Sequence, residues 1–229
     1  MPLILNIETA TGVCSVALSE GETVLSIEET TEKYAHAKVI TQLIHTCMTT
    51  ANARLEALDA VAVSSGPGSY TALRVGVSAA KGICYALDKP LIAVDTLQSI
   101  AWAMAKQHPG MDYYVPMIDA RRMDVYSAVF DKDNNPVTKT GFESIVENSY
   151  KSYFASENKL LFSGDGAAKC KSIIDSPYAF FSEVACSAAH MPHLSHQSFL
   201  GRVFQDLAYF VPNYHKAPNI TTPKRRILG

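Results

Sequence analysis

Two stretches of this chain repeat one pattern, in which a strand ends in an acidic residue and a turn leads into a second strand. The first copy is predicted over residues 3–18 and the second over residues 114–130. The copies align without a gap, so that Glu8 stands opposite Asp119 and Ala17 opposite Ala128. This duplication predicts two similar halves, each built around its own sheet. Two unrelated hairpins are the alternative, because short alternating strands also match by chance.

Apolar periodicity places further elements between and after these copies. Each half is expected to continue from its strands into helices, with the second half less regular than the first. The predicted elements are a strand over Thr23–Glu28, a helix with its apolar face over Val39–Met48, a strand over Ala60–Val63, a helix over Val77–Leu87, a strand over Leu91–Val94, a helix over Thr96–Ala105, a strand over Lys159–Phe162 and a helix over Phe199–Phe210.

Composition restricts the class of protein. The chain has 229 residues, of which 48% are hydrophobic and 18% charged, and its net charge is −2. A protein that binds nucleic acid on its own needs clustered cations, so this balance argues against that class. Five cysteines without a Cys-x-x-Cys pair, no export signal and no apolar run of membrane-spanning length lead us to expect reduced thiols in a cytoplasmic protein.

Residues 64–76, here called the signature segment, join the strand Ala60–Val63 to the helix that follows. Gly66 and Gly68 permit a tight turn, Pro67 stiffens it, and Ser69 is the expected N-cap. Such a turn can present backbone N–H groups to an anion, or it can simply connect two elements. It is neither a P-loop nor a dinucleotide fingerprint, because the Lys-Ser or Lys-Thr pair and the third glycine are missing.

Three segments together resemble one known family. These are Leu3–Thr11, Gly66–Gly76 and Met117–Arg121, and they are similar in sequence and order to the bacterial TsaB, or YeaZ, family. The resemblance is specific to about residue 130. It implies an α/β actin/Hsp70-like (ASKHA) fold with two ribonuclease-H-like halves of mixed sheets flanked by helices. The expected domains are residues 1–108, with the partner interface, and residues 109–229, more divergent and with an extended tail.

The resemblance also implies a function. Members of the family are noncatalytic scaffolds that pair with a metal-dependent threonylcarbamoyl transferase paralogue (TsaD-like) to form N6-threonylcarbamoyladenosine in tRNA next to the anticodon. An accessory ATPase (TsaE-like), a second copy of the chain, and tRNA reached through the complex are further implied partners. The basic run Lys224–Arg226 could contact RNA or be a solvated end. A homodimeric binding protein without a tRNA role is one rival interpretation.

The fold family suggests where nucleotide loops would lie. Its phosphotransferases carry an acid and, two residues later, a glycine in each phosphate turn. Here the acids are present, but Ala10 and Arg121 replace the glycines and would crowd a phosphate chain. We therefore expect no ATP hydrolysis by this chain alone and no tightly bound cofactor, with ATP or ADP held only at an interface of the complex. An active ATP-dependent phosphotransferase acting on a small molecule is the alternative. The vestigial loop residues are Glu8, Thr11, Gly66, Gly68, Ser69, Asp119, Gly164 and Gly166.

Metal binding is not expected. The paralogue's His-x-x-x-His pair is absent, and the helix predicted over Thr96–Ala105 has no histidine. His190, His193 and His196 are spaced by three, but Pro192 opposes a continuous helix and no carboxylate or cysteine is adjacent in sequence.

The predicted partner surface lies on two helices of the first half. Small residues on the helix after the signature loop would let another helix approach closely, and larger side chains would add contacts. The same side chains could instead cover their own sheet. The predicted interface residues are Ala37, Ile40, Ile44, Cys47, Tyr70, Thr71, Leu73, Arg74, Gly76, Val77, Ala79 and Ala80.

Overall fold

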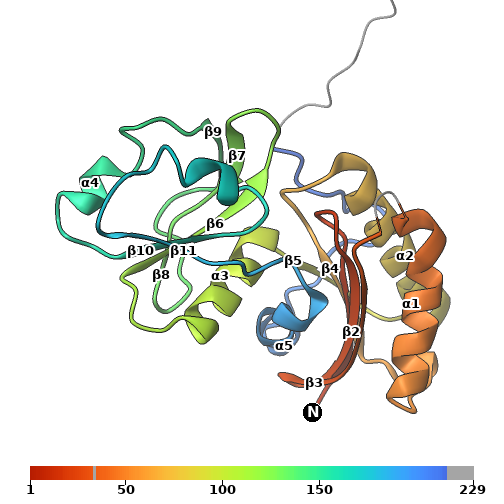
Figure 1. Cartoon of the computed structure of the whole chain (residues 1–229). Helices are drawn as coiled ribbons and strands as arrows, with labels where there is room; N and C mark the ends of the chain where they lie inside the picture. The colour runs from red at the N-terminus through yellow and green to blue at the C-terminus, as the bar shows by residue number, and fades with distance from the viewer. Residues whose placement is uncertain (33–34, 216–229) are drawn as a thin grey trace, which may run out of the picture.

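A computed structural model describes residues 1–32 and 35–215 (Figure 1). The first half is built on a five-stranded sheet in the order β3-β2-β1-β4-β5, in which β3, β2 and β1 are antiparallel and β1, β4 and β5 are parallel. Its strands are β1 (Leu3–Glu8), β2 (Cys14–Glu20), β3 (Thr23–Thr30), β4 (Ala60–Ser64) and β5 (Leu91–Val94).

The second sheet repeats this arrangement. Its strand order is β11-β10-β6-β7-β9, with antiparallel pairing of β6, β7 and β9 and parallel pairing of β6, β10 and β11, and β8 pairs with β6. Taken from β9 to β11, this order and its strand directions match those of the first sheet from β3 to β5. The match confirms the predicted duplication. The strands are β6 (Tyr113–Asp119), β7 (Asp124–Ser127), β8 (Phe130–Asp131), β9 (Gly141–Ser144), β10 (Leu160–Ser163) and β11 (Ala179–Phe181).

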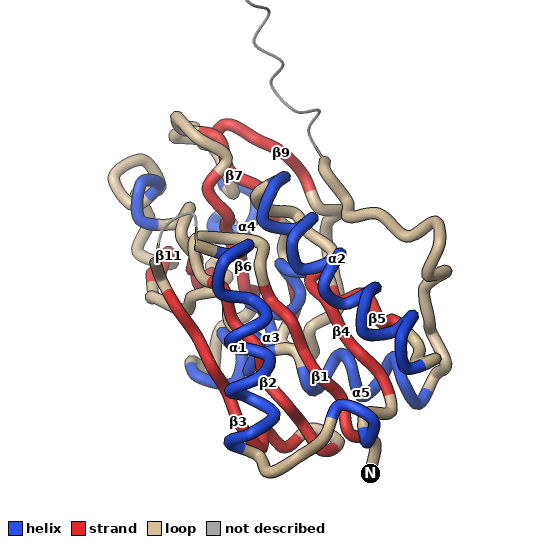
Figure 2. The backbone as a smooth tube through the Cα atoms, turned by 90° about the vertical axis from the view of Figure 1, so that its right-hand side faces the viewer, coloured by secondary structure: helices blue, strands red, loops and turns tan. Residues whose placement is uncertain are grey.

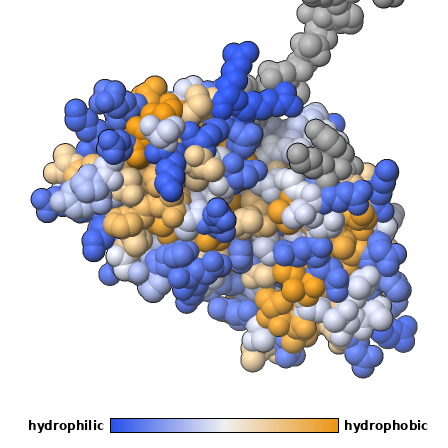
Figure 3. All heavy atoms as spheres, in the orientation of Figure 1, coloured by the Kyte–Doolittle hydropathy of each residue, from blue (hydrophilic) through white to orange (hydrophobic). Residues whose placement is uncertain are grey.

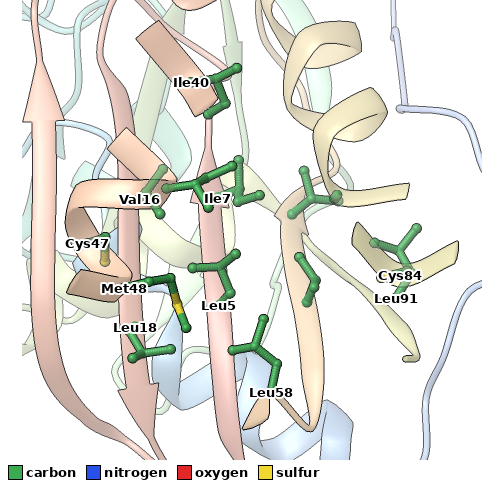
Figure 4. Packing of buried hydrophobic residues seen from close by; sticks show 14 of the residues in the cluster. Leu5, Ile7, Val16, Leu18, Ile40, Cys47, Met48, Leu58, Cys84 and Leu91 are labelled. Atoms are coloured by element: carbon green, nitrogen blue, oxygen red, sulfur yellow. The ribbon is translucent and has the colours of Figure 1, made fainter. Parts of the chain in front are cut away.

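Two long helices cover one face of the first sheet. α1 (His36–Thr50) packs on β2 and β3, and α2 (Tyr70–Leu87) packs on β4 (Figure 2). Both are amphipathic, so their apolar faces fill the space above the strands. Figure 4 shows this core, in which Ile40, Cys47 and Met48 of α1 lie against Leu5 and Val16 of the sheet.

The chain crosses between the halves twice. α3 (Thr96–Gln107) packs on β6 of the second sheet, whereas α5 (Pro192–Leu200) returns to β1 and β5 of the first. The domain boundary after residue 108 stays a prediction, and α3 and α5 pack across it. The remaining short helices are α4 (Lys151–Phe154), η1 (Leu55–Ala57), η2 (Ala168–Cys170) and η3 (Ala188–His190).

The helix predicted over Phe199–Phe210 is wrong. The helix in this region is α5, which ends at Leu200 because Gly201 follows and Arg202 takes a positive φ of 53°. Beyond it, Gln205 forms an antiparallel bridge with Leu91. The second strand of the repeat predicted over residues 114–130 is also interrupted, with β7 ending at Ser127 and β8 beginning at Phe130.

The surface and the cysteines follow ordinary packing rules. On the face shown in Figure 3, hydrophobic patches are separated by hydrophilic side chains. All five cysteines are buried and free. Over the described residues, no helix combines the length and the apolar character needed to cross a bilayer. Lys224–Arg226 lies outside the described residues.

Candidate functional site

The turn of the signature segment, here called the signature loop, forms hydrogen bonds with other segments of its own chain. The Ser69 N–H donates to the Ala10 carbonyl at 2.7 Å, and the Gly66 N–H donates to Thr96 Oγ1 at 3.2 Å. Ser69 also caps α2, as predicted, with its hydroxyl accepting from the Ala72 N–H. These two N–H groups therefore bond to other parts of the protein. In an anion-binding loop, by contrast, they would point at a ligand.

Two glycines of the signature segment are needed for close packing. A Cβ at Gly68 would lie 2.4 Å from the Ala10 carbonyl oxygen, and a Cβ at Gly76 would lie 2.3 Å from Thr9 Oγ1. Both distances are far below van der Waals contact. The glycines thus let the loop and α2 approach the end of β1, which is a structural reason for their presence.

Glu8 lies beneath this loop at the end of β1. Its side chain is buried, and its Oε1 accepts the Ala10 N–H at 2.6 Å. The pKa of Glu8 is raised from 4.5 to about 7, mainly by burial and to a smaller extent by the Asp95 carboxylate, although hydrogen bonds from Ala10, Ser64 and Thr9 act in the opposite direction. Glu8 is therefore a buried acid that holds the turn after β1.

The second acidic strand end is different. Asp119 is exposed, and the Lys169 ammonium contacts its carboxylate while donating to the Asp124 carbonyl at 2.7 Å. The Asp119 N–H donates to Asp165 Oδ1 at 2.9 Å. The second acid is thus paired with a cation of its own chain.

The glycines after β10 pack like those after β4. A Cβ at Gly164, which has a φ of +99°, would lie 2.3 Å from the Met117 carbonyl oxygen, and one at Gly166 would lie 2.9 Å from the carbonyl carbon of Ile118. Both glycine loops therefore press against the first strand of their own half. Thr11, the last of the predicted loop residues, is buried after β1 and accepts the Val13 N–H at 3.4 Å.

The predicted partner surface is divided by the structure. Gly76, which we expected at a helix contact, faces Thr9, the residue that follows β1. Ala37, Thr71 and Arg74 are exposed, and Tyr70 and Ala79 are half-buried. The residues buried within the chain itself are Ile40, Ile44, Cys47, Leu73, Gly76, Val77 and Ala80.

The end of the described chain lies along α2. Arg74 Nε donates to the Tyr214 hydroxyl at 3.1 Å, and its guanidinium lies 4.3 Å from the centre of the Tyr70 ring. The rings of Tyr70 and Tyr214 are 4.5 Å apart. Sequence reasoning missed Tyr214 and the Lys169–Asp119 pair, because contacts between distant segments leave no local pattern.

The histidine cluster forms part of a packed polar group. Pro192 occupies the first turn of α5, so it begins the helix that we expected it to oppose. His193 Nδ1 lies 3.1 Å and His196 Nδ1 3.8 Å from Glu22, a carboxylate brought near by folding, and the Trp102 ring stacks on His193 at 3.6 Å. The pKa of Glu22 is lowered, mainly by its hydrogen bond with His193. Among the described residues, no group of three or more metal-ligating side chains is placed to hold an ion.

Known proteins resemble this chain along most of its length. The TsaB protein of Bacillus subtilis, named for tRNA threonylcarbamoyladenosine biosynthesis, is 27% identical over 223 residues, which is 92% of this chain and 93% of that protein. The TsaB protein of Escherichia coli, named for the same biosynthesis, is 34% identical over 134 residues, which is 58% of this chain and 57% of that protein.

Solved structures share the fold. A Pseudomonas aeruginosa protein described as similar to peptidase YEAZ superposes with a TM-score of 0.83 at 22% identity, covering 94% of this chain and all of that one. The activator of the 2-hydroxyisocaproyl-CoA dehydratase from Clostridium difficile, solved with bound ADPNP, gives a TM-score of 0.51 at 7% identity over 87% of this chain and 95% of that one. Together with the two matching sheets, these likenesses show the actin-like fold.

The family is set by a sequence model that covers most of the chain. The model described as TsaD, tRNA N6-adenosine threonylcarbamoyltransferase, matches residues 23–222. The Bacillus subtilis relative, which aligns over 92% of the chain, is named as a TsaB biosynthesis protein. Relatives that match about half of the chain or less include proteins named as the transferase itself. The chain therefore belongs to the TsaD family and, within it, to the TsaB (YeaZ) proteins.

Proposed function

We propose that this chain is a noncatalytic subunit in the formation of threonylcarbamoyladenosine in tRNA, where it pairs with a TsaD-type threonylcarbamoyl transferase. Its similarity to TsaB proteins supports a role in threonylcarbamoyladenosine formation. The observation that carries the noncatalytic role is the signature loop, in which the Gly66 and Ser69 N–H groups bond within the chain and Gly68 and Gly76 pack against it.

The positions of the two acids support the same role. Glu8 is buried beneath the loop, and Asp119 is paired with Lys169. A phosphotransferase of this fold needs room for a phosphate chain in both turns, and here Ala10 and Arg121 stand at the two glycine positions, while Lys169 pairs with Asp119. We therefore propose that the chain holds no cofactor tightly and that ATP or ADP is bound, if at all, where subunits of the complex meet.

The exposed side of α1 and α2 is the surface we propose for the transferase partner. Ser78 and Gly82 of α2 are exposed, and no atom lies within 4 Å of a Cβ built on Gly82. Small side chains at this spacing let a second helix come close. A second copy of the chain would use the same face, so the homodimer and the heterodimer would exclude each other. An accessory ATPase would engage the heterodimer, tRNA would be reached through it, and the complex would work in the cytoplasm.

Reconstitution tests the proposed function. The transferase, the accessory ATPase, tRNA and the threonylcarbamoyl donor are combined with and without this protein, and threonylcarbamoyladenosine is quantified by nucleoside mass spectrometry. We expect product to depend on the protein, while the protein alone releases no phosphate from ATP. Undiminished product in its absence, or ATP turnover by the protein alone, would overturn the proposal.

A further inference from the structure

A cavity of about 650 Å³ lies where the two halves meet, away from the signature loop. The end of β3 forms one side, the last residue of α3 another, and the segment of residues 183–190 that crosses between the sheets a third. The cavity is open to solvent, and Glu29 and Glu183 are exposed. Its walls include Val13, Ile27, Glu29, Gln107, Glu183 and His190. The volume is in the range of small-molecule sites.

The charge of the cavity has one sign. Glu29 and Glu183 contribute carboxylates, and among the described lining residues none is lysine or arginine. Glu29 is held in place, because its Oε1 accepts the hydroxyls of Ser15 at 2.7 Å and Ser187 at 2.5 Å. Both bonds use the same oxygen, so Oε2 is left for a further donor. Such a positioned carboxylate favours a cationic group that donates hydrogen bonds.

His190 adds a second acceptor. Its Nδ1 is buried and has no hydrogen-bond partner in the described part of the chain, although the ring lines the cavity. Burial lowers the pKa of His190, against the Glu29 carboxylate and the Ala185 backbone, which raise it. This shift favours the neutral ring, which can accept a hydrogen bond. A buried polar atom without a hydrogen-bond partner destabilises the fold, and a ligand that donates a hydrogen bond to it removes this penalty.

We propose that this cavity binds a small organic molecule with a primary ammonium group, with Glu29 as the counter-ion. The ammonium donates to Glu29 Oε2 and, after a small turn of the imidazole, to His190. The alkyl part of the molecule lies against Val13, Ile27 and Val184. This site is separate from the helix surface proposed for the transferase, so either proposal can fail without the other.

A series of three probes of equal length tests the site. n-Butylammonium, 1-butanol and butyrate are titrated separately into the full-length protein, and the methyl resonances of Val13, Ile27 and Val184 are followed by NMR. We expect saturable shifts at millimolar n-butylammonium, at least tenfold weaker binding of 1-butanol, and no saturable shift with butyrate. Equal binding of all three probes, or no saturable shift with n-butylammonium, would overturn the proposal.

Matched substitutions test the role of Glu29. Glu29→Gln removes the charge but keeps an oxygen that can accept from Ser15 and Ser187, so the fold should be retained. Glu28→Gln makes the same change on the neighbouring residue, whose carboxylate meets Thr50 of α1 and not the cavity. We expect Glu29→Gln to weaken n-butylammonium binding about tenfold and Glu28→Gln to leave it unchanged. Equal affinity of both variants would refute the assignment. Glu183→Gln, which removes the other carboxylate that lines the cavity, is titrated with n-butylammonium in the same way.

Discussion

At the scale of single residues, the glycines of the signature segment explain why the loop has its sequence. Gly68 and Gly76 touch the chain just after β1, where any side chain would collide with Ala10 or Thr9. Their role is to bring two segments together, so the pattern is needed even if no nucleotide is bound. In an interior packed at this density, each added methyl group is destabilising.

Gly76→Ala should therefore destabilise the protein. We expect a loss of about 1–3 kcal/mol in the free energy of unfolding, because the new Cβ must displace Thr9. Gly82→Ala, on the exposed side of the same helix, should instead raise it by about 0.5–1 kcal/mol. Chemical denaturation of both variants checks this, and equal stability would show that the close approach at Gly76 is unimportant.

Glu8 should make stability depend on pH. Its folded pKa of about 7 exceeds the ordinary 4.5, so between these values the folded chain keeps a proton that the unfolded chain has released. The free energy of unfolding should fall by up to about 3 kcal/mol as pH rises through this window. Denaturation across pH 4.5–7.5 should show this fall in the wild type and not in Glu8→Gln; parallel profiles would contradict it.

At the scale of elements, residues 205–214 act as a strap along the first half. Leu207 and Phe210 pack against its core, Lys81 Nζ donates to the Ala208 carbonyl at 3.3 Å, and the Asn213 N–H donates to the Ser65 carbonyl at 2.7 Å. The strap thus joins α2 to the signature loop. It ends beside Arg74, one of the residues predicted to meet a partner.

Tyr214 should hold the end of the strap. Tyr214→Ala removes the ring contact with Tyr70 and the hydrogen bond from Arg74, which together hold this end of the strap. Hydrogen exchange at the Asn213 amide should become about tenfold faster. Tyr209→Ala serves as the control, since that side chain is 83% exposed. Unchanged exchange in Tyr214→Ala would show that the strap is held elsewhere.

Much of this arrangement could be predicted from local pattern. The first five strands, the Ser69 cap and the duplication were found because apolar alternation and turn residues act over short distances. The helix expected over Phe199–Phe210 failed because Gly201 and the pairing of Gln205 with Leu91 override its apolar spacing. The Glu22–His193 and Lys169–Asp119 pairs join distant segments, and local periodicity carries no information on them.

At the scale of the whole molecule, two halves share one strand order but differ in the surroundings of their acidic strand ends. In each half, a glycine loop presses on the first strand, yet one acid is buried and the other is paired with a lysine. The first half also offers the exposed side of α1 and α2. We propose that the protein works through this surface and not through phosphate chemistry.

The most direct test is reconstituted tRNA modification with a matched pair of surface variants. Ser78→Arg places a bulky cation on the proposed surface of α2, and Ser152→Arg makes the same change on α4 of the other half; both serines are exposed. With both variants folded, we predict that Ser78→Arg abolishes binding to the transferase and reduces threonylcarbamoyladenosine at least tenfold, whereas Ser152→Arg matches the wild type. Full product with Ser78→Arg would contradict the account.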